Sequence, residues 1–339
     1  MSTSERLEQF FPFDEAVLEQ VSDAATWQNR FTFPQLAARY GIEDGPQVVP
    51  ATHDHKAFEV LTLEPQGDYD PSQARLLHLG MSLPIDPNTT MRALRLFGAD
   101  QSRQLIVTGS PAAAGQRYGK LRFQDMKKVW DGDLTPAVDP FLAYVHGLGV
   151  KRTEEVGFSY GADKAAASAM RAGAFDIAAE RGVWMESASA VNRGPGLTGL
   201  ARLGIDFISA GEELENYVAA CASPPLREAR EQADVGMPRY LLGLGRLSNL
   251  AIANALAHDG FEDRVRRALS MQPELKATVA WGTSSELADD AVMRALTERL
   301  RAAFGEERVN PLALENMHHI GCDDIDLHAA IVLQGLRSA

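Results

Sequence analysis

The chain has 339 residues, of which 45% are hydrophobic and 23% are charged, a composition typical of a folded globular protein. It carries 33 Lys and Arg residues against 46 Asp and Glu residues, a formal net charge of −13. That charge disfavours binding to nucleic acid and to anionic lipid, so we expect a small molecule or another protein as the partner. The length suits about two domains of roughly 150 residues, or one α/β domain with an insertion.

The sequence gives no sign of a membrane or secreted protein. No apolar run reaches the roughly 18 residues that cross a bilayer. The first residues are acidic where a secretion signal would be basic and then apolar, which favours a cytoplasmic location. The two cysteines, Cys221 and Cys322, lie far apart in the sequence and predict neither a disulfide framework nor a cysteine metal site.

Residues 1–45 predict amphipathic helical pieces, which we expect to pack on the main body as an N-terminal extension. Beyond them, short apolar runs alternate with longer segments of helical period, the pattern of a mostly parallel sheet flanked by helices. The run Phe58–Leu63 partly alternates, as an edge strand with one wet face would. The expected strands are Gln47 to Pro50, Phe58 to Leu63, Arg75 to Gly80, Gln104 to Gly109, Glu154 to Phe158, Val183 to Glu186, Thr278 to Trp281 and Val309 to Leu314.

Helical segments separate these strands: Thr89 to Phe97, Ala162 to Glu180, Asp289 to Phe304 and Asp324 to Leu336. One stretch breaks the alternation, because residues 190–275 look wholly helical. Such an insertion is most simply a cap over one end of the sheet. The sequence therefore predicts an α/β core at 46–189 and 276–339, with a helical cap at 190–275.

The strongest local signal is Gly157-x-Ser159-x-Gly161, placed between a short strand-like run and an alanine-rich helix. This spacing is typical of a tight strand-to-helix turn that exposes the serine hydroxyl above the sheet, over the helix N-terminus. The two glycines leave room for neighbouring backbone. The alternative interpretation is a glycine-bearing turn with an incidental serine.

With this turn, the chain from about Phe58 to its end resembles the α/β-hydrolase superfamily. The resemblance implies that Ser159 is a nucleophile after the fifth strand. It also implies that an oxyanion-hole amide follows the third strand, where Leu79-Gly80 replaces the His-Gly pair of many relatives. The amides of Met81 and Tyr160 would then be the oxyanion donors, and main chain alone suffices for that role. The alternative for the segment after Gly80 is a plain loop.

The resemblance also implies a catalytic histidine on the loop after the last strand. The pair His318 and His319 stands there, after the nucleophile in chain order. Either could be the base, and we favour His318 slightly. A further histidine, His328, falls within the predicted terminal helix and is expected to be structural or exposed.

The triad acid is harder to assign. Relatives usually carry it after the seventh strand, where this chain has Ser285 in place of the frequent aspartate, followed by Glu286. Glu286 is therefore the first candidate. Glu186, after the sixth strand, is the alternative acid, and Asp289 is a second alternative that could instead cap the next helix.

Other motifs predict less. His53 and His55 flank Asp54 and could share a metal, but no third ligand is evident and a solvated turn fits better. Gly243 and Gly245 resemble part of a nucleotide loop but follow no strand, so dinucleotide binding is not expected. The sequence predicts no metal and no cofactor.

These features together predict a serine hydrolase that cleaves an ester-type acyl bond of a small molecule through an acyl-enzyme on Ser159. Two alternatives stay open: a non-catalytic binding protein of the same fold, and an acyltransferase using the same site. A histidine within hydrogen-bond reach of Ser159 would favour catalysis, whereas separations beyond about 6 Å would favour binding. The sequence leaves a homo-oligomer open.

Overall fold

The computed structural model describes residues 2–52, 56–81, 83–110, 121–194, 196–206, 224–233, 247–258, 260–319 and 324–338. Its centre is an eight-stranded sheet with the order β1-β2-β4-β3-β5-β6-β7-β8. The strands are β1 Gln47–Val49, β2 Phe58–Leu63, β3 Gln73–His78, β4 Gln104–Thr108, β5 Arg152–Phe158, β6 Ala178–Met185, β7 Lys276–Gly282 and β8 Val309–Leu314.

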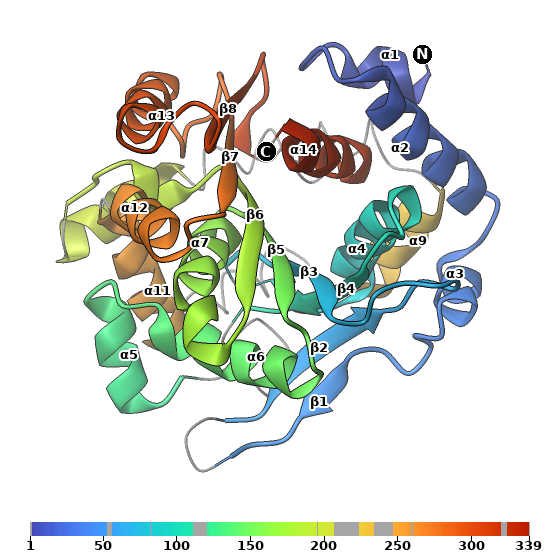
Figure 1. Ribbon diagram of the computed structural model, residues 1–339, viewed down its shortest axis with the longest axis horizontal. Coiled ribbons are helices and arrows are strands. Elements are labelled where there is room, and N and C mark those ends of the chain that lie inside the picture. The colour runs from blue at the N-terminus through green and yellow to red at the C-terminus, as the bar shows by residue number, and fades with distance from the viewer. Residues whose placement is uncertain are drawn as a thin grey trace.

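Helices cover both faces of this sheet (Figure 1). The α-helices are α1 Thr3–Leu7, α2 Glu15–Gln28, α3 Phe33–Arg39, α4 Pro87–Ala99, α5 Phe123–Trp130, α6 Thr135–Gly147, α7 Tyr160–Ala172, α9 Pro224–Ala233, α11 Leu247–Ala257, α12 Phe261–Met271, α13 Asp290–Phe304 and α14 Ile325–Ser338. Two short 3-10 helices are η1 Gly173–Phe175 and η2 Ala188–Ala190.

The six strands from β4 to β8 in the sheet order run parallel, whereas β2 is antiparallel to both β1 and β4. This confirms the predicted α/β architecture with a mostly parallel sheet flanked by helices. Because the carboxyl ends of parallel strands meet at one edge of a sheet, the loops after β3, β5, β6, β7 and β8 lie near one another.

Two details of the sequence prediction were wrong. Strand β2 is not the edge strand, because the short β1 pairs outside it. The helix predicted from Ala162 to Glu180 ends at Ala172, since a 3-10 turn and the left-handed residue Asp176 (φ 56°) redirect the chain. Strand β6 then starts at Ala178, where pairing with β5 overrides the helical preference of alanine.

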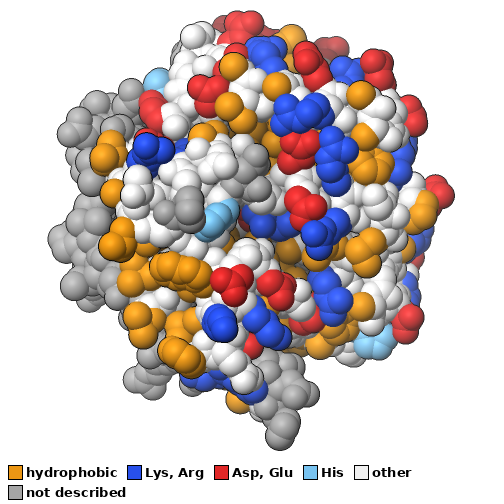
Figure 2. All heavy atoms as spheres, turned by 90° about the vertical axis from the view of Figure 1, so that its left-hand side faces the viewer, with side chains coloured by type: hydrophobic (Ala, Val, Ile, Leu, Met, Phe, Trp, Pro, Cys, Tyr) orange, Lys and Arg blue, Asp and Glu red, His pale blue; other side chains and the backbone are white. Residues whose placement is uncertain are grey.

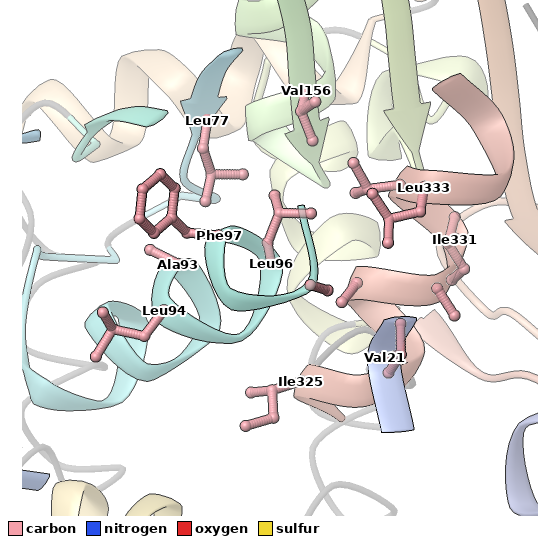
Figure 3. Packing of buried hydrophobic residues seen from close by; sticks show 14 of the residues in the cluster. Val21, Leu77, Ala93, Leu94, Leu96, Phe97, Val156, Ile325, Ile331 and Leu333 are labelled. Carbon is pink, nitrogen blue, oxygen red and sulfur yellow. The ribbon is translucent and has the colours of Figure 1, made fainter. Parts of the chain in front are cut away.

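One face of the sheet is covered by α4 and α14, with α2 packed on both helices (Figures 1 and 3). Leu96 and Phe97 of α4 face Leu77 and Val156 of the sheet, and Leu333 of α14 completes the contact. All five side chains are buried. This apolar layer therefore holds α4 and α14 against the sheet. Helices α6, α7, α12 and α13 cover the opposite face.

The N-terminal helices are attached to this body by specific polar contacts. Arg6 donates to Asp326 of α14 at 2.7 Å, and the backbone N–H of Asp14 donates to Gln334 Oε1 at 2.9 Å. Arg95 of α4 donates to Gln28 Oε1 at 2.7 Å. The division at residue 45 into extension and core stays a prediction.

Most of the described residues in 190–275 are helical, and three of these helices pack in different places. Helix α12 lies against α7, α11 lies against α5, and α9 lies against α4. Residues 207–223 and 234–246 are outside the described residues, so the cap boundaries at 190 and 275 stay a prediction. Among the described helices none is both long and apolar enough to cross a membrane.

The side of the molecule that carries α5, α11, α12 and α13 is shown in Figure 2. Hydrophobic side chains gather in the lower left part of this face, and acidic and basic side chains are interspersed over the rest. Large exposed hydrophobic residues of α5 and α11 include Phe123, Trp130 and Leu247.

His328 is fully buried in α14, and among the described residues neither of its ring nitrogens has a hydrogen-bond partner. Burial, with a smaller contribution from the positive charge of Arg92, holds the pKa of His328 well below its ordinary value. Below pH ~6.5 the unfolded chain therefore binds a proton at His328 that the folded protein does not, and folding stability falls as the solution is acidified.

We expect His328→Leu to remove this acid sensitivity. The free energy of unfolding of the variant, relative to wild type, should rise as the pH falls from 7 to 5, by up to about 1.4 kcal/mol per pH unit. Urea denaturation at several pH values measures it. His146→Leu is the control, because His146 is exposed on α6. A wild-type to His328→Leu difference that does not change with pH would contradict the expectation.

Candidate active site

Ser159 lies in a sharp turn between β5 and α7. Its backbone has φ 54° and ψ −126°, a conformation that costs a non-glycine residue of order 1–3 kcal/mol. The N–H of Ser159 donates to the carbonyl of Met185 at 2.9 Å, which ties the turn to the end of β6. The surrounding structure maintains this strained backbone conformation, which places the Ser159 side chain at the carboxyl edge of the sheet.

Steric crowding explains why both of these positions in the turn, Gly157 and Gly161, are glycine. A Cβ at Gly157 would collide with the carbonyl of Gly161, and a Cβ at Gly161 would collide with the carbonyl of His78 at the end of β3. Helix α7 therefore starts so close to β5 and β3 that only glycine fits at both contacts. The spacing seen in the sequence follows from this close approach.

His319 connects Ser159 to a carboxylate. His319 Nε2 lies 3.1 Å from Ser159 Oγ, and His319 Nδ1 lies 3.0 Å from Glu186 Oε2. The exposed fractions of the three residues are 4% for Ser159, 2% for His319 and 0% for Glu186. The ring of Phe158 packs against the imidazole with centroids 5.1 Å apart. The three polar groups thus form one buried chain of hydrogen bonds.

Glu186 is held from several sides. It follows β6 with a left-handed backbone, φ 56°, and its N–H donates to the carbonyl of Ala280 at 2.9 Å. The N–H of Gly282 donates to Oε1, and Ser285 Oγ donates to Oε2 at 2.6 Å. Donors on both oxygens fix the orientation in which the carboxylate meets His319.

The loop after β7 also contacts the histidine loop. A Cβ at Gly282 would collide with the carbonyl of Met317, and the N–H of Ser284 donates to that same carbonyl at 3.2 Å. Gly282 therefore contacts Glu186 through its N–H and lies against the loop of His319 through its Cα. The loops after β6, β7 and β8 are packed as one unit.

The structure groups the candidate residues into two sets. Ser159, His319 and Glu186 form the buried chain, whereas His318 and Glu286 pair with each other at 3.0 Å near the surface. The side chain of His318 is 41% exposed and that of Glu286 is 30% exposed. The sequence preference for His318 and Glu286 is therefore not the pairing that the structure brings to Ser159.

The remaining candidates have other roles or lie elsewhere. Asp289 caps α13, with its carboxylate accepting from the N–H of Val292 at 3.0 Å. The sequence did not predict the role of Ser285. Its hydroxyl donates to Glu186 and accepts from the N–H of Ala288 at 3.1 Å. The signal was present, because a serine stood where relatives usually have an acid.

The loop after β3 lies beside Ser159. A Cβ at Gly80 would be 3.8 Å from the Cβ of Ser159 and 3.5 Å from the carbonyl of Phe158. Met81, the next residue, is buried and packs in an apolar cluster that includes Tyr160. Both predicted oxyanion residues thus belong to the segments that flank Ser159.

Within the described residues, no group of three or more His, Cys, Asp or Glu side chains is arranged to hold a metal ion. The candidate metal pair His53 and His55 and the glycines Gly243 and Gly245 lie outside the described residues.

Comparisons with known proteins identify the fold. No protein-family model matches the sequence, and no curated protein matches it. Among solved structures, E-2-(acetamidomethylene)succinate hydrolase has a TM-score of 0.56 at 14% identity, covering 86% of this chain and 98% of that chain. The N-formylmaleamic acid deformylase from Pseudomonas putida S16 has a TM-score of 0.55 at 13% identity, covering 85% and 99%.

A third structure, 2-hydroxy-6-oxo-6-phenylhexa-2,4-dienoate hydrolase from a Rhodococcus strain, has a TM-score of 0.54 at 14% identity and covers 86% of this chain and 99% of that chain. The three similar structures are α/β-hydrolase-fold enzymes. The chain therefore has the α/β-hydrolase fold, which is the fold that the resemblance seen in the sequence implied.

Proposed function

We propose that this protein is a serine hydrolase that cleaves an ester-type acyl bond, with Ser159 as nucleophile, His319 as base and Glu186 as acid. The observation that carries the proposal is the buried hydrogen-bond chain from Ser159 Oγ through the imidazole to the Glu186 carboxylate, with both separations close to 3 Å. A serine hydroxyl is a weak nucleophile unless an adjacent base takes its proton.

In the first step, Ser159 Oγ attacks the acyl carbonyl while His319 Nε2 accepts the hydroxyl proton. His319 Nδ1–H donates to Glu186, which keeps the imidazole in the tautomer whose Nε2 accepts the proton of Ser159 Oγ. The carboxylate also stabilises the imidazolium that forms. Its own two donors, Gly282 and Ser285, hold it in place as the charge develops.

The negative charge that develops on the acyl oxygen needs donors. In this proposal they are the backbone N–H groups of Met81 and Tyr160. Tyr160 is the first residue of α7, so its N–H has no acceptor within the helix, and the helix N-terminus adds a favourable dipole. The N–H of Ser159 is already bonded to Met185. Two preorganised amides can lower a barrier by several kcal/mol.

The tetrahedral intermediate collapses when the His319 imidazolium gives its proton to the leaving oxygen. The alcohol departs and the acyl group stays on Ser159 Oγ. Water then attacks this ester, with the same imidazole taking its proton, and a second collapse releases the acid and restores the serine hydroxyl. Every proton therefore returns through His319, and no cofactor is required by this sequence of steps.

An ester is the simplest substrate class, because an alkoxide leaves more readily than an amide nitrogen. Thioesters, amides, peptides and lactones use the same chemistry. The net charge of −13 favours a small acyl compound over nucleic acid as the partner.

The non-catalytic binding protein is the main rival. The distance of 3.1 Å between His319 Nε2 and Ser159 Oγ supports catalysis over that rival, because it lies within hydrogen-bond reach. Acyl transfer to an alcohol or amine would use the same first half-reaction, and product analysis with an added acceptor distinguishes it from hydrolysis.

Labelling with a fluorophosphonate probe tests the proposal. We expect wild type to be labelled and Ser159→Ala to be unlabelled, because the probe reacts only with an activated serine. A folded wild type that stays unlabelled would overturn the proposal and favour the binding protein.

Two matched pairs of variants test the assigned roles. We expect His319→Ala to slow labelling by at least about 1,000-fold and Glu186→Gln by at least about 100-fold, since the base and its orienting acid are lost. The controls His318→Ala and Glu286→Gln remove the neighbouring, partly exposed pair and should stay within about twofold of wild type. The assignment is wrong if the control variants lose labelling and the first two keep it.

A further inference from the structure

A second buried polar cluster lies directly behind the candidate acid. Ser187 follows Glu186 in the chain, and Ser189 is in η2. Both hydroxyls bond to Asp163 of α7: Ser187 Oγ donates to Asp163 Oδ2 at 2.9 Å, and Ser189 Oγ donates to Oδ1. Asp163 stands one helical turn after Ser159, so α7 contacts both the nucleophile turn and the turn that carries Glu186.

The charge of Asp163 is balanced from α12, which packs beside α7 (Figure 1). Arg264 Nη2 forms an ion pair with Asp163 Oδ1 and donates to Ser189 Oγ at 2.6 Å. Asp163, Ser187 and Ser189 are fully buried, and Arg264 is 7% exposed. A buried carboxylate with this set of partners is held in one position, because each partner would be left unsatisfied by a shift.

The backbone around the cluster is adapted to it. The N–H of Gly260, just before α12, donates to the carbonyl of Ser189 at 3.2 Å. This hydrogen bond is a second contact of the α12 segment with the turn, in addition to that of Arg264. A Cβ at Gly260 would lie 2.7 Å from Arg264 Nη1, so the guanidinium packs closely against this glycine. The turn after Glu186 is thus fastened to two helices at once.

We propose that Asp163 and Arg264 are positioning residues, which act through Ser187 and Ser189 to hold Glu186 at the distance where its carboxylate orients His319. The inference rests on the proposed function, because it concerns the acid of the same site. Neither residue touches the reacting atoms. Their effect follows from geometry: displacing a catalytic group by about 1 Å can cost on the order of 100-fold in rate.

The test uses the double variant Ser187→Ala/Ser189→Ala. It removes the hydrogen bonds that Asp163 and Arg264 make to the two serine hydroxyls of the turn, while keeping the ion pair between Asp163 and Arg264. Ser168→Ala is the matched control. Ser168 is buried on the same helix, and among the described residues its hydroxyl has no partner. We expect the double variant to react with a fluorophosphonate at least about tenfold more slowly than Ser168→Ala.

A second readout separates positioning from a general loss of structure. In the folded protein the proton shared by His319 Nδ1 and Glu186 should give a low-field proton NMR signal. We expect this signal in wild type and in Ser168→Ala, and its loss or shift in the double variant. Circular dichroism checks the fold, and Ser187→Ala alone replaces the double variant if the latter does not fold.

The outcomes distinguish this inference from the function on which it rests. An unlabelled, folded wild type removes both. A labelled wild type together with a double variant that reacts as fast as Ser168→Ala, and keeps the low-field signal, overturns the positioning role alone. Slower labelling together with a changed signal supports it.

Discussion

The close contact of α7 with β5 and β3 is the constraint on which the site depends. Gly157 meets the backbone of Gly161, and Gly161 meets the carbonyl of His78, at separations that no Cβ allows. Because the helix must begin immediately after the strand, Ser159 is forced into its left-handed conformation. Its hydroxyl is thereby directed to the edge of the sheet where the loops after β6 and β8 also end.

Each of these loops contains a strained backbone position of its own. Ser159 after β5, Glu186 after β6 and Asn316 after β8 all have φ between 54° and 56° without being glycine. Such conformations persist only where the surrounding structure holds them, and they concentrate at functional sites. Two sets of contacts stabilise these conformations here. Gly282 packs against Met317, and Ser187 and Ser189 donate hydrogen bonds to Asp163. The stable sheet thus supports a locally strained edge.

Much of the fold was predictable because strands such as Phe58–Leu63 and Val309–Leu314 are marked by local patterns. The turn at Ser159 was predictable for the same reason. The pairing of histidine and acid was not, because it depends on side chains that meet across three loops. Glu186 reaches His319 since Met185 is in register with Ala280, and no sequence pattern reveals that register. At the position where relatives usually carry the acid, this chain has Ser285, whose hydroxyl donates to Glu186.

In the proposed mechanism, Glu186 acts on Ser159 only through His319. A double-mutant cycle on the fluorophosphonate labelling rate tests this most directly, with Glu186→Gln, His319→Ala and both together. If the three residues act as one unit, adding Glu186→Gln to His319→Ala changes the labelling rate by less than about twofold. Glu186→Gln alone, in contrast, slows labelling by at least about 100-fold. Rate losses that multiply in the double variant would show that Glu186 acts independently of His319 and would contradict the proposed mechanism.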